Sequence, residues 1–291
     1  MIFVTGAGGT VGGELVKKLL ALGVKFRAGY HSSAKAEEAK QRGVDSVAID
    51  FANPEALQPL LRGVDKLFLI SGNIPHQDEL ELNVVREAKK AGVRHTVKNS
   101  VWGAESEAFS FANVHRPVER EIEASGVAYT FLRPNGYMQN MSSFYAQTIK
   151  TQGAFYLPAG EARISHIDVR DIAGVAAKVL TGTGHEGKAY DLTGPEALTY
   201  SQIAEKLSAA TGKKVSYAAI SDAEFKRAMV SSRAPEEAAD AIIELLHYYL
   251  SGQASRISPA VRQITGKEPI SFSQYARDYA ASFLQEARAA G

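Results

Sequence analysis

The chain opens with an apolar stretch, Ile2-Phe3-Val4-Thr5, that runs directly into the glycine-rich segment Gly6-Ala7-Gly8-Gly9-Thr10-Val11-Gly12. Apolar residues then recur with a helical period at Val11, Leu15, Leu19 and Leu22. A strand, a glycine turn and a helix in this order form a phosphate-binding unit, because the first N–H groups of the helix are free and its N-terminus is positively polarised. We therefore expect a dinucleotide to bind at this turn.

The three evenly spaced glycines have different roles in such a unit. Gly6 permits the tight turn, Gly9 lets the backbone approach a pyrophosphate, and Gly12 lets the helix pack closely on the strand. A glycine turn can also serve chain reversal alone, but the flanking strand and helix favour a nucleotide. The predicted cofactor contacts in this segment are Thr5, Gly6, Gly8, Gly9, Thr10, Val11 and Gly12.

The composition excludes several classes of function. The 291 residues are 45% hydrophobic and 22% charged, with a net charge of +1 and no cysteine. A nearly neutral chain gives no electrostatic case for binding nucleic acid or an anionic membrane, and no apolar run approaches the ~20 residues that span a bilayer. Without cysteine there is no disulfide, thiol nucleophile or thiolate metal site. We expect a cytoplasmic protein, a monomer or a homodimer, that binds no metal.

Strands and helices alternate through about residue 134, which predicts an α/β fold with a doubly wound parallel Rossmann sheet. The expected nucleotide-binding domain comprises residues 1–134 plus about 160–184. A smaller α/β C-terminal substrate domain would comprise residues 135–159 and 185–291, with a loop at 155–158 and strands at 189–192 and 214–217. Residues 164–172 are expected to form a strand that leads into a helix, with Asp168 as a cap and Asp171 in an inter-domain hydrogen bond. A ligand cleft is expected where the domains meet.

The end of the second predicted strand indicates which dinucleotide binds. NAD-binding versions of the fold carry an acidic residue about 20 positions past the glycines, yet none lies between Ala21 and Ala36. Instead His31, two serines and Lys35 occur there, and these would suit a 2′-phosphate, although they could simply form a loop and a helix cap. We therefore expect NADPH rather than NADH, and no flavin.

Other predicted cofactor contacts lie at later strand ends. Ser71 and Gly72 close the fourth strand, and Asn99 and Ser100 close the fifth. At such positions the backbone passes close to the nicotinamide side of a dinucleotide. Ser100 could equally be a turn former.

Three common catalytic motifs are missing from the sequence. None of the twelve tyrosines is followed by lysine four residues later, so the Tyr-x-x-x-Lys pair of conventional short-chain dehydrogenases is absent. There is neither a Gly-x-Ser-x-Gly elbow nor a His-Glu-x-x-His metal helix. Hydrolase and metalloenzyme functions are therefore disfavoured.

Several segments together resemble the NmrA-like branch of the atypical short-chain dehydrogenases, and within it the NADPH-dependent quinone reductases and triphenylmethane dye reductases. They are the three-glycine turn, Ala48-Ile49-Asp50, Lys66-Leu67-Phe68-Leu69-Ile70-Ser71-Gly72, Ala91-Gly92-Val93-Arg94-His95, Ser125-Gly126-Val127-Ala128-Tyr129-Thr130-Phe131-Leu132-Arg133 and Gly184-His185-Glu186-Gly187-Lys188. The resemblance covers nearly the whole chain. One departure is Lys98-Asn99-Ser100-Val101-Trp102, where relatives more often show Tyr-Thr-Ser or Tyr-Thr-Gly, in a loop that the resemblance places beside the nicotinamide.

The resemblance also implies roles for single residues. Asp50 and Phe51 would lie near the adenine, and Asn135 beside the nicotinamide. Plant relatives carry a catalytic lysine early in the helix before the sixth strand, and that family's spacing places His115 there. A histidine can hold a substrate oxygen or donate a proton near neutral pH; the alternative is a structural histidine that binds a backbone carbonyl.

The expected activity is hydride transfer from NADPH to a quinone or a similar flat conjugated acceptor. Aromatic residues near the predicted cleft would form the acceptor pocket: Trp102, Tyr137, Phe144 and Tyr145. The partner is thus a small aromatic molecule. The alternative is a redox sensor of the NmrA type, which binds the dinucleotide without turning it over.

Overall fold

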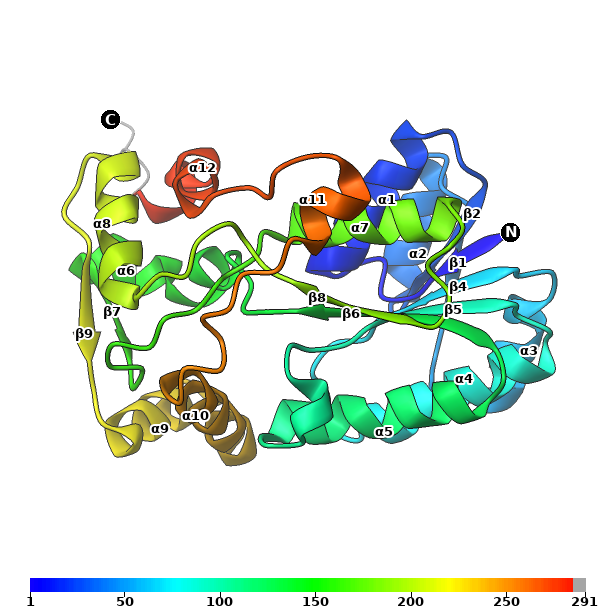
Figure 1. Ribbon diagram of the computed structural model, residues 1–291, viewed down its shortest axis with the longest axis horizontal. Helices are drawn as coiled ribbons and strands as arrows, with labels where there is room; N and C mark the ends of the chain where they lie inside the picture. Colours follow the sequence, from blue (N-terminus) through cyan, green and yellow to red (C-terminus); the bar gives the residue numbers. More distant parts are fainter. Residues whose placement is uncertain (285–291) are drawn as a thin grey trace.

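The computed structural model describes residues 1–284, and a parallel seven-stranded sheet forms its centre (Figure 1). The strands are β1 (Ile2–Val4), β2 (Phe26–Tyr30), β3 (Ser46–Ala48), β4 (Lys66–Leu69), β5 (His95–Asn99), β6 (Ala128–Pro134) and β8 (Lys188–Leu192), in the spatial order β3-β2-β1-β4-β5-β6-β8. All their pairings are parallel. The predicted doubly wound Rossmann sheet is confirmed.

Helices cover both faces of this sheet (Figure 1). One face carries α1 (Thr10–Ala21), α2 (Ser33–Gln41), α7 (Val169–Thr181) and α11 (Ala260–Thr265), and the other carries α3 (Pro54–Leu61), α4 (Gln77–Lys90) and α5 (Ser110–Ala124). Each face has its own buried apolar cluster, because residues of a parallel strand point alternately to the two helix layers. Leu15 and Val175 lie in one cluster, and Leu57 and Val118 in the other.

A smaller unit packs beside the carboxyl ends of the strands (Figure 1). Its two parallel strands are β7 (Ala154–Leu157) and β9 (Ser216–Ala219). The helical segments around them are a π-helical turn (Met141–Tyr145), α6 (Ala146–Gln152), α8 (Tyr200–Thr211), α9 (Asp222–Ser231), α10 (Glu236–Leu250), α12 (Phe272–Asp278) and the 3₁₀ turn Ala280–Phe283. A third buried cluster, which includes Phe155, Phe272 and Tyr275, is the core of this unit.

Two segments expected in the smaller domain lie in the larger one. β8 pairs with β6 as the seventh strand of the main sheet, and α11 packs on α7 with Ala260 and Val261 in the same buried cluster. The expected boundary at residue 185 is corrected here, because Leu192 is buried beneath the helices of the main sheet.

Local differences from the sequence predictions also occur. Residues 154–157 form β7 rather than a loop, and the strand expected at 214–217 lies at 216–219. Between 164 and 168 there are only two isolated bridges, Ile164 with Leu198 and Ile167 with Tyr137, so no continuous strand precedes α7. These short stretches cross between the two units, where no neighbouring strand extends their pairing.

The strand order places the glycine turn where ligands bind in such sheets. The chain proceeds outward from β1 through β2 to β3, then returns to β4 on the other side of β1. The loops that follow β1 and β4 therefore diverge to opposite faces and leave a crevice at the carboxyl edge. The Gly6–Gly12 turn stands directly in this crevice.

Candidate active site

A cavity of about 650 Å³ extends from the glycine turn across the ends of β4, β5 and β6 to the smaller unit. Its first half is lined by Gly6, Gly8, Gly9, Thr10 and Val11 together with residues that end β2 and β4. Its second half is lined by α5, the segment after β6, and α10. Among the described residues that line it, none is Asp or Glu. A cavity with this lining favours an anionic ligand.

The glycine turn has the geometry that the sequence predicts. Gly6 has φ +57°, in the left-handed region that favours glycine, and a Cβ on Gly12 would lie 2.2 Å from the Gly6 carbonyl oxygen. Gly9 is the residue before α1, and the first turn of α1 contains no acidic residue. The free N–H groups of this turn are therefore available to phosphate.

Basic and hydroxyl side chains border the cavity beyond β2. His31, Ser32 and Lys35 all line it, and His31 and Lys35 are exposed. The hydroxyl oxygen of Ser32 accepts a hydrogen bond from the backbone N–H of Lys35 at 3.4 Å and caps α2. The lysine is thus held on the first turn of a helix, where the helix dipole also favours an anion.

The predicted contacts at later strand ends also line the cavity, namely Ser71, Gly72, Asn99, Ser100 and Asn135. Three of their side chains are engaged within the protein. The Ser71 hydroxyl donates to Glu81 and the Ser100 hydroxyl to Glu119, both at 2.7 Å. The Asn135 amide donates to Ser165 Oγ and to the Ala254 carbonyl oxygen. These residues shape the cavity chiefly through their backbone.

Asn99 differs from them because one of its polar atoms is unsatisfied. Its Nδ2 donates to the Tyr137 hydroxyl at 3.2 Å, whereas its buried Oδ1 has no hydrogen-bond partner among the described residues. A buried carbonyl oxygen without a donor is costly. Because this oxygen is fully buried, it is closed off from the cavity, and Asn99 too contributes to the cavity wall.

His115 lies on α5 and lines the cavity. Its side chain is nearly buried, and its Nδ1 lies 3.0 Å from Nζ of Lys98, which is fully buried. Burial, followed by the charge of Lys98, holds the pKa of His115 well below its ordinary value. Lys98 Nζ in turn lies 2.7 Å from Oε2 of the buried Glu81. The structural alternative, a bond from the histidine to a backbone carbonyl, is not what the structure shows.

Aromatic side chains surround the far half of the cavity. Tyr137, Phe144 and Tyr145 line it, and Phe144 is 71% exposed. Burial raises the pKa of Tyr137 and of Tyr145, so both rings stay neutral near pH 7. The surface is therefore apolar and uncharged, as a flat conjugated molecule would require.

Five predicted site residues do not line the cavity. Thr5 and Gly12 lie beneath the turn: the Thr5 hydroxyl donates to the Ile70 carbonyl oxygen at 2.8 Å, and Gly12 contacts Gly6. Asp50 accepts a bond from the Ala52 N–H in a turn, and Phe51 packs partly buried against the core. Trp102 is buried elsewhere, with Nε1 donating to the Gln253 carbonyl oxygen at 3.0 Å and Arg256 over its ring.

Sequence reasoning missed an entire wall of the cavity. α10 contributes Ile242, Leu245, Leu246 and Tyr249, and His166 and Tyr200 complete the floor. The spacing of the four α10 residues is that of one helix face, which indicates packing but does not reveal what it faces. Burial lowers the pKa of His166 to about 4, so this histidine is neutral near pH 7.

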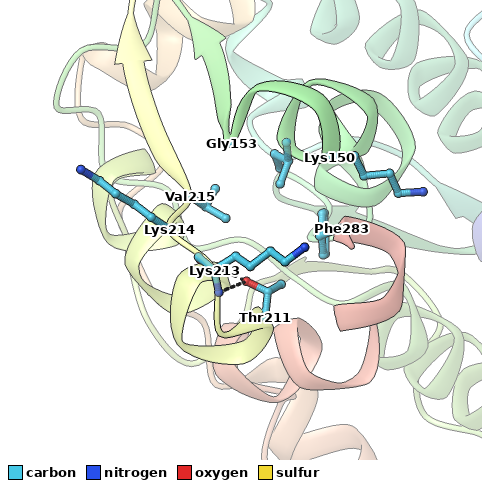
Figure 2. Close-up of a pocket in the computed structure, with 8 residues that line it drawn as sticks. Lys150, Gly153, Thr211, Lys213, Lys214, Val215 and Phe283 are labelled. Atoms are coloured by element: carbon cyan, nitrogen blue, oxygen red, sulfur yellow. Dashed lines mark hydrogen bonds between the residues drawn. The ribbon is translucent and has the colours of Figure 1, made fainter. Parts of the chain in front are cut away.

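A second cavity of about 220 Å³ lies in the smaller unit, between α6, the turn before β9 and Phe283 (Figure 2). Lys213 and Lys214 are exposed on that turn, where the Lys213 N–H donates to the Thr211 hydroxyl. It has none of the buried histidine and lysine network of the larger cavity. The larger cavity is therefore the candidate active site.

Residues 1–284, which the structure describes, include no helix that is long and apolar enough to cross a membrane. They contain no group of three or more His, Cys, Asp or Glu side chains that could hold a metal ion.

The chain belongs to the NmrA-like family, whose sequence profile matches residues 1–273. It is 38% identical to the NAD(P)H azoreductase of Xenophilus azovorans over 286 residues, covering 97% of this chain and 99% of that one. The Escherichia coli NADPH-dependent quinone oxidoreductase QOR2, solved with NADPH, is 30% identical with a TM-score of 0.87, covering 96% and 99% of the two chains. The Citrobacter sp. triphenylmethane reductase, solved with NADP(H), is also 30% identical, with a TM-score of 0.84 and the same coverage. The family and the fold predicted from the sequence are both confirmed.

Proposed function

We propose that this chain is an NADPH-dependent reductase that transfers a hydride to a quinone or a similar flat conjugated acceptor, such as an azo or triphenylmethane dye. The observation that carries the proposal is that one cavity joins the phosphate-binding turn to an aromatic and aliphatic wall on the smaller unit. The azoreductase, quinone oxidoreductase and triphenylmethane reductase that resemble the chain support the same class of reaction.

The residues of the first half fit a dinucleotide. The turn at Gly9 leaves the N-terminus of α1 open to a pyrophosphate, and the close contact between Gly12 and Gly6 brings that helix end to the strand. Asn99 and Asn135, at the ends of β5 and β6, line the cavity beyond the turn. NADPH would thus be held by the glycine turn at one end and by the ends of β5 and β6 at the other.

The choice of NADPH over NADH rests on the border beyond β2. A carboxylate there would bind ribose hydroxyls and repel a 2′-phosphate, but the described lining contains no acidic residue. Lys35 and the Ser32 hydroxyl can both bind a phosphate. A 2′-phosphate would therefore be attracted by the Lys35 cation and would meet no carboxylate that repels it.

When bound, NADPH supplies the hydride. The apolar side chains of α10, with Tyr145 opposite, would hold a flat acceptor and exclude water from it. His115 also lines the cavity, where it would contact an oxygen or nitrogen of the acceptor. No Tyr-Lys acid pair is needed, because hydride addition converts a neutral quinone to a delocalised phenolate that takes a proton from water. A cationic triphenylmethane dye becomes a neutral product that needs no proton.

The proposal is tested by following the loss of NADPH absorbance with a panel of quinones, azo dyes and triphenylmethane dyes. Acceptor-dependent oxidation, saturable in both substrates, is expected. A matched reaction without acceptor controls for spontaneous oxidation. NADPH binding in calorimetry without turnover on any member of the panel would instead identify a dinucleotide sensor.

A further inference from the structure

The segment that departs from the family pattern contains a fully buried lysine. Lys98 is 0% exposed, and so is Glu81, whose Oε2 lies 2.7 Å from its Nζ. The Glu81 carboxylate is held from its other side by the Ser71 hydroxyl at 2.7 Å and by Gln77 Nε2 at 3.3 Å. This cluster links the end of β4, α4, β5 and α5 directly behind the cavity.

The hydrogen bonds of the lysine fix the protonation of its neighbour. An ammonium group has three N–H donors and no acceptor. Lys98 Nζ has three acceptors in reach: Glu81 Oε2, the Asn99 carbonyl oxygen at 2.8 Å, and His115 Nδ1 at 3.0 Å. Two of these contacts are hydrogen bonds, to the Asn99 carbonyl oxygen and to His115 Nδ1, and the contact with Glu81 is an ion pair. Because the ammonium has no lone pair, Nδ1 of the histidine must be the acceptor, so the ring proton resides on Nε2.

The Nε2 atom of His115 is open to the cavity. His115 lines the cavity, and its Nε2 has no hydrogen-bond partner among the described residues and is not one of the fully buried unpaired atoms. A donor without a partner therefore points to where the acceptor molecule would bind.

We propose that Lys98, anchored by Glu81, is a positioning residue that fixes His115 as a neutral Nε2–H hydrogen-bond donor toward the acceptor. This inference rests on the proposed function and specifies how its central histidine acts. The histidine would stabilise negative charge on the acceptor rather than give up a proton. A neutral imidazole can polarise an electrophile in this way when its surroundings prevent protonation.

The charged groups around α5 are consistent with a neutral ring. They are Glu81 and Arg86 on α4, Lys98 on β5, Arg133 on β6, Glu105 and Glu107 before α5, Glu244 on α10, and Arg116, Glu119, Arg120, Glu121 and Glu123 on α5 itself. Glu119 is paired with Arg116 and Arg133, Arg120 with Glu107, and Glu244 accepts from Ser110. Of these described groups, Lys98 is the one in contact with the imidazole, and with burial it lowers the pKa of His115.

The stability of the fold does not by itself explain why the Lys98–Glu81 ion pair is buried. Two ions removed from water lose hydration that their mutual attraction does not reliably restore, and apolar residues of similar size often stabilise a core as well or better. A buried ammonium that donates a hydrogen bond to a cavity histidine has a role that such residues could not fill.

The step then balances without an enzyme acid. A hydride leaves NADPH with both bonding electrons and adds to a neutral acceptor such as a quinone, which becomes an anion, while NADPH becomes NADP⁺. The Nε2–H of His115 donates to the atom that carries the new charge and keeps its proton. Water protonates the product, a phenolate in the case of a quinone, during or after release.

The tautomer can be measured directly on the wild-type full-length protein. Selective ¹⁵N-histidine labelling and long-range ¹H–¹⁵N correlation spectra distinguish Nε2–H, Nδ1–H and imidazolium, and His115→Gln assigns the signal. We expect a neutral Nε2–H ring that does not titrate between pH 8 and 5.5. A Nδ1–H ring, or titration near pH 6.5, would overturn the inference. This readout requires no turnover, so it is independent of whether any acceptor is reduced.

Variants test whether the lysine sets this state. Removing Lys98 alone would leave Glu81 buried and unpaired, so the double variant Glu81→Gln with Lys98→Met keeps the core neutral. We expect an altered tautomer or a restored titration of His115, with an unchanged Kd for NADPH. We also expect kcat to fall by roughly 10- to 100-fold, because the acceptor loses one preorganised hydrogen-bond donor. The control Lys66→Met removes a part-buried lysine bonded to the Gly182 carbonyl oxygen and should change none of these.

Each combination of results has a definite meaning. An unchanged His115 spectrum in the double variant would show that Lys98 does not fix the tautomer of His115. An altered spectrum with unchanged kcat overturns the role of the histidine while leaving the reductase function intact. If wild type reduces no acceptor, the proposed function fails together with the donor role, even where the spectrum shows the expected tautomer.

Discussion

A Cβ atom placed on Gly12 would lie 2.2 Å from the carbonyl oxygen of Gly6, and 2.8 Å from its carbonyl carbon. No non-bonded carbon approaches an oxygen this closely, so the first turn of α1 touches the strand end only because residue 12 lacks a side chain. This contact brings the positive end of α1 to the cavity. Stability and phosphate binding thus depend on the same pair of residues.

Gly12→Ala should therefore destabilise the fold itself. Because the obstructing atoms are backbone, α1 must move, and overpacking of this kind costs about 1–3 kcal/mol. Urea unfolding measures the change. The control is Gly13→Ala in the same turn, where the new Cβ would lie an ordinary 3.6 Å from the Ala7 carbonyl oxygen; it should be neutral or stabilising by up to about 1 kcal/mol. Equal stabilities for the two variants would contradict this account.

Gly9→Val should behave differently, with binding lost and the fold retained. Gly9 has φ −86° and ψ 176°, which any residue can adopt, and its Cβ would lie 3.2 Å from the Gly6 carbonyl oxygen. The branched side chain would occupy the path of a pyrophosphate, so NADPH affinity should fall by roughly 100-fold, about 2.7 kcal/mol. Calorimetry gives the affinity and circular dichroism checks the fold. Normal binding by a folded variant would reduce the turn to a structural role.

The parts of the molecule that could be predicted are those set by local sequence. The order of strands and helices, the glycine turn and the cap at Asp168 follow from short-range periodicity and backbone sterics. The α10 wall could not be found in this way, because Ile242 and Leu245 reach the cavity only through tertiary packing more than 100 residues from His115. Trp102 shows the converse: proximity in sequence to a strand end did not bring its ring into the cavity.

Lys98, where the end of β5 differs from the family pattern, likewise shows that sequence alone does not reveal which side chains interact. The residue differs from the family pattern in sequence. Glu81 on α4 and His115 on α5 each lie 17 positions from Lys98 in the chain, and only the fold brings both to its ammonium group. Burial of all three groups is a property of the packed layers of α4, β5 and α5. A comparison of sequence patterns identifies Lys98 as unusual, but it does not identify the residues that Lys98 contacts.

Lys35→Gln should narrow the preference for NADPH. The variant removes a cation from the first turn of α2 while keeping a hydrogen-bonding side chain, and a hydrogen bond to a charged group contributes about 1.5–3 kcal/mol. NADPH affinity should fall by roughly 10-fold and NADH affinity should change little, as measured by calorimetry. Lys40→Gln, at the other end of the same helix, is the matched control. Equal losses for both dinucleotides would place Lys35 outside the 2′-phosphate site.

Asp171 should make stability depend on pH in an unusual direction. Burial raises the pKa of this carboxyl to about 6, although its Oδ2 accepts a bond from the Ile270 N–H at 2.7 Å. Between its unfolded pKa of about 3.9 and this value the folded state holds the extra proton, so this group's contribution to stability falls as pH rises and levels off above about pH 7.

Asp171→Asn removes this titration and keeps an acceptor for Ile270. Relative to wild type, the variant should gain about 2–3 kcal/mol in unfolding free energy between pH 4 and pH 8. Urea titrations at several pH values measure the difference, with the exposed Glu37→Gln as a control for general charge removal. A constant difference across this range would show that the carboxyl is already ionised in the folded protein at pH 4.

Leu245→Ala should separate acceptor binding from cofactor binding. Leu245 is half-buried on the α10 wall, far along the cavity from the glycine turn, and its side chain would cover the face of a flat acceptor. Loss of this apolar contact, worth about 1.5 kcal/mol, should lower kcat/KM for quinones by roughly 10-fold, mainly through KM. NADPH affinity should stay unchanged. Leu250→Ala, on an exposed position of the same helix outside the cavity, should alter neither quantity. Steady-state kinetics with calorimetry decides the matter: an equal loss of NADPH affinity in Leu245→Ala would mean that the α10 wall contacts the dinucleotide rather than the acceptor.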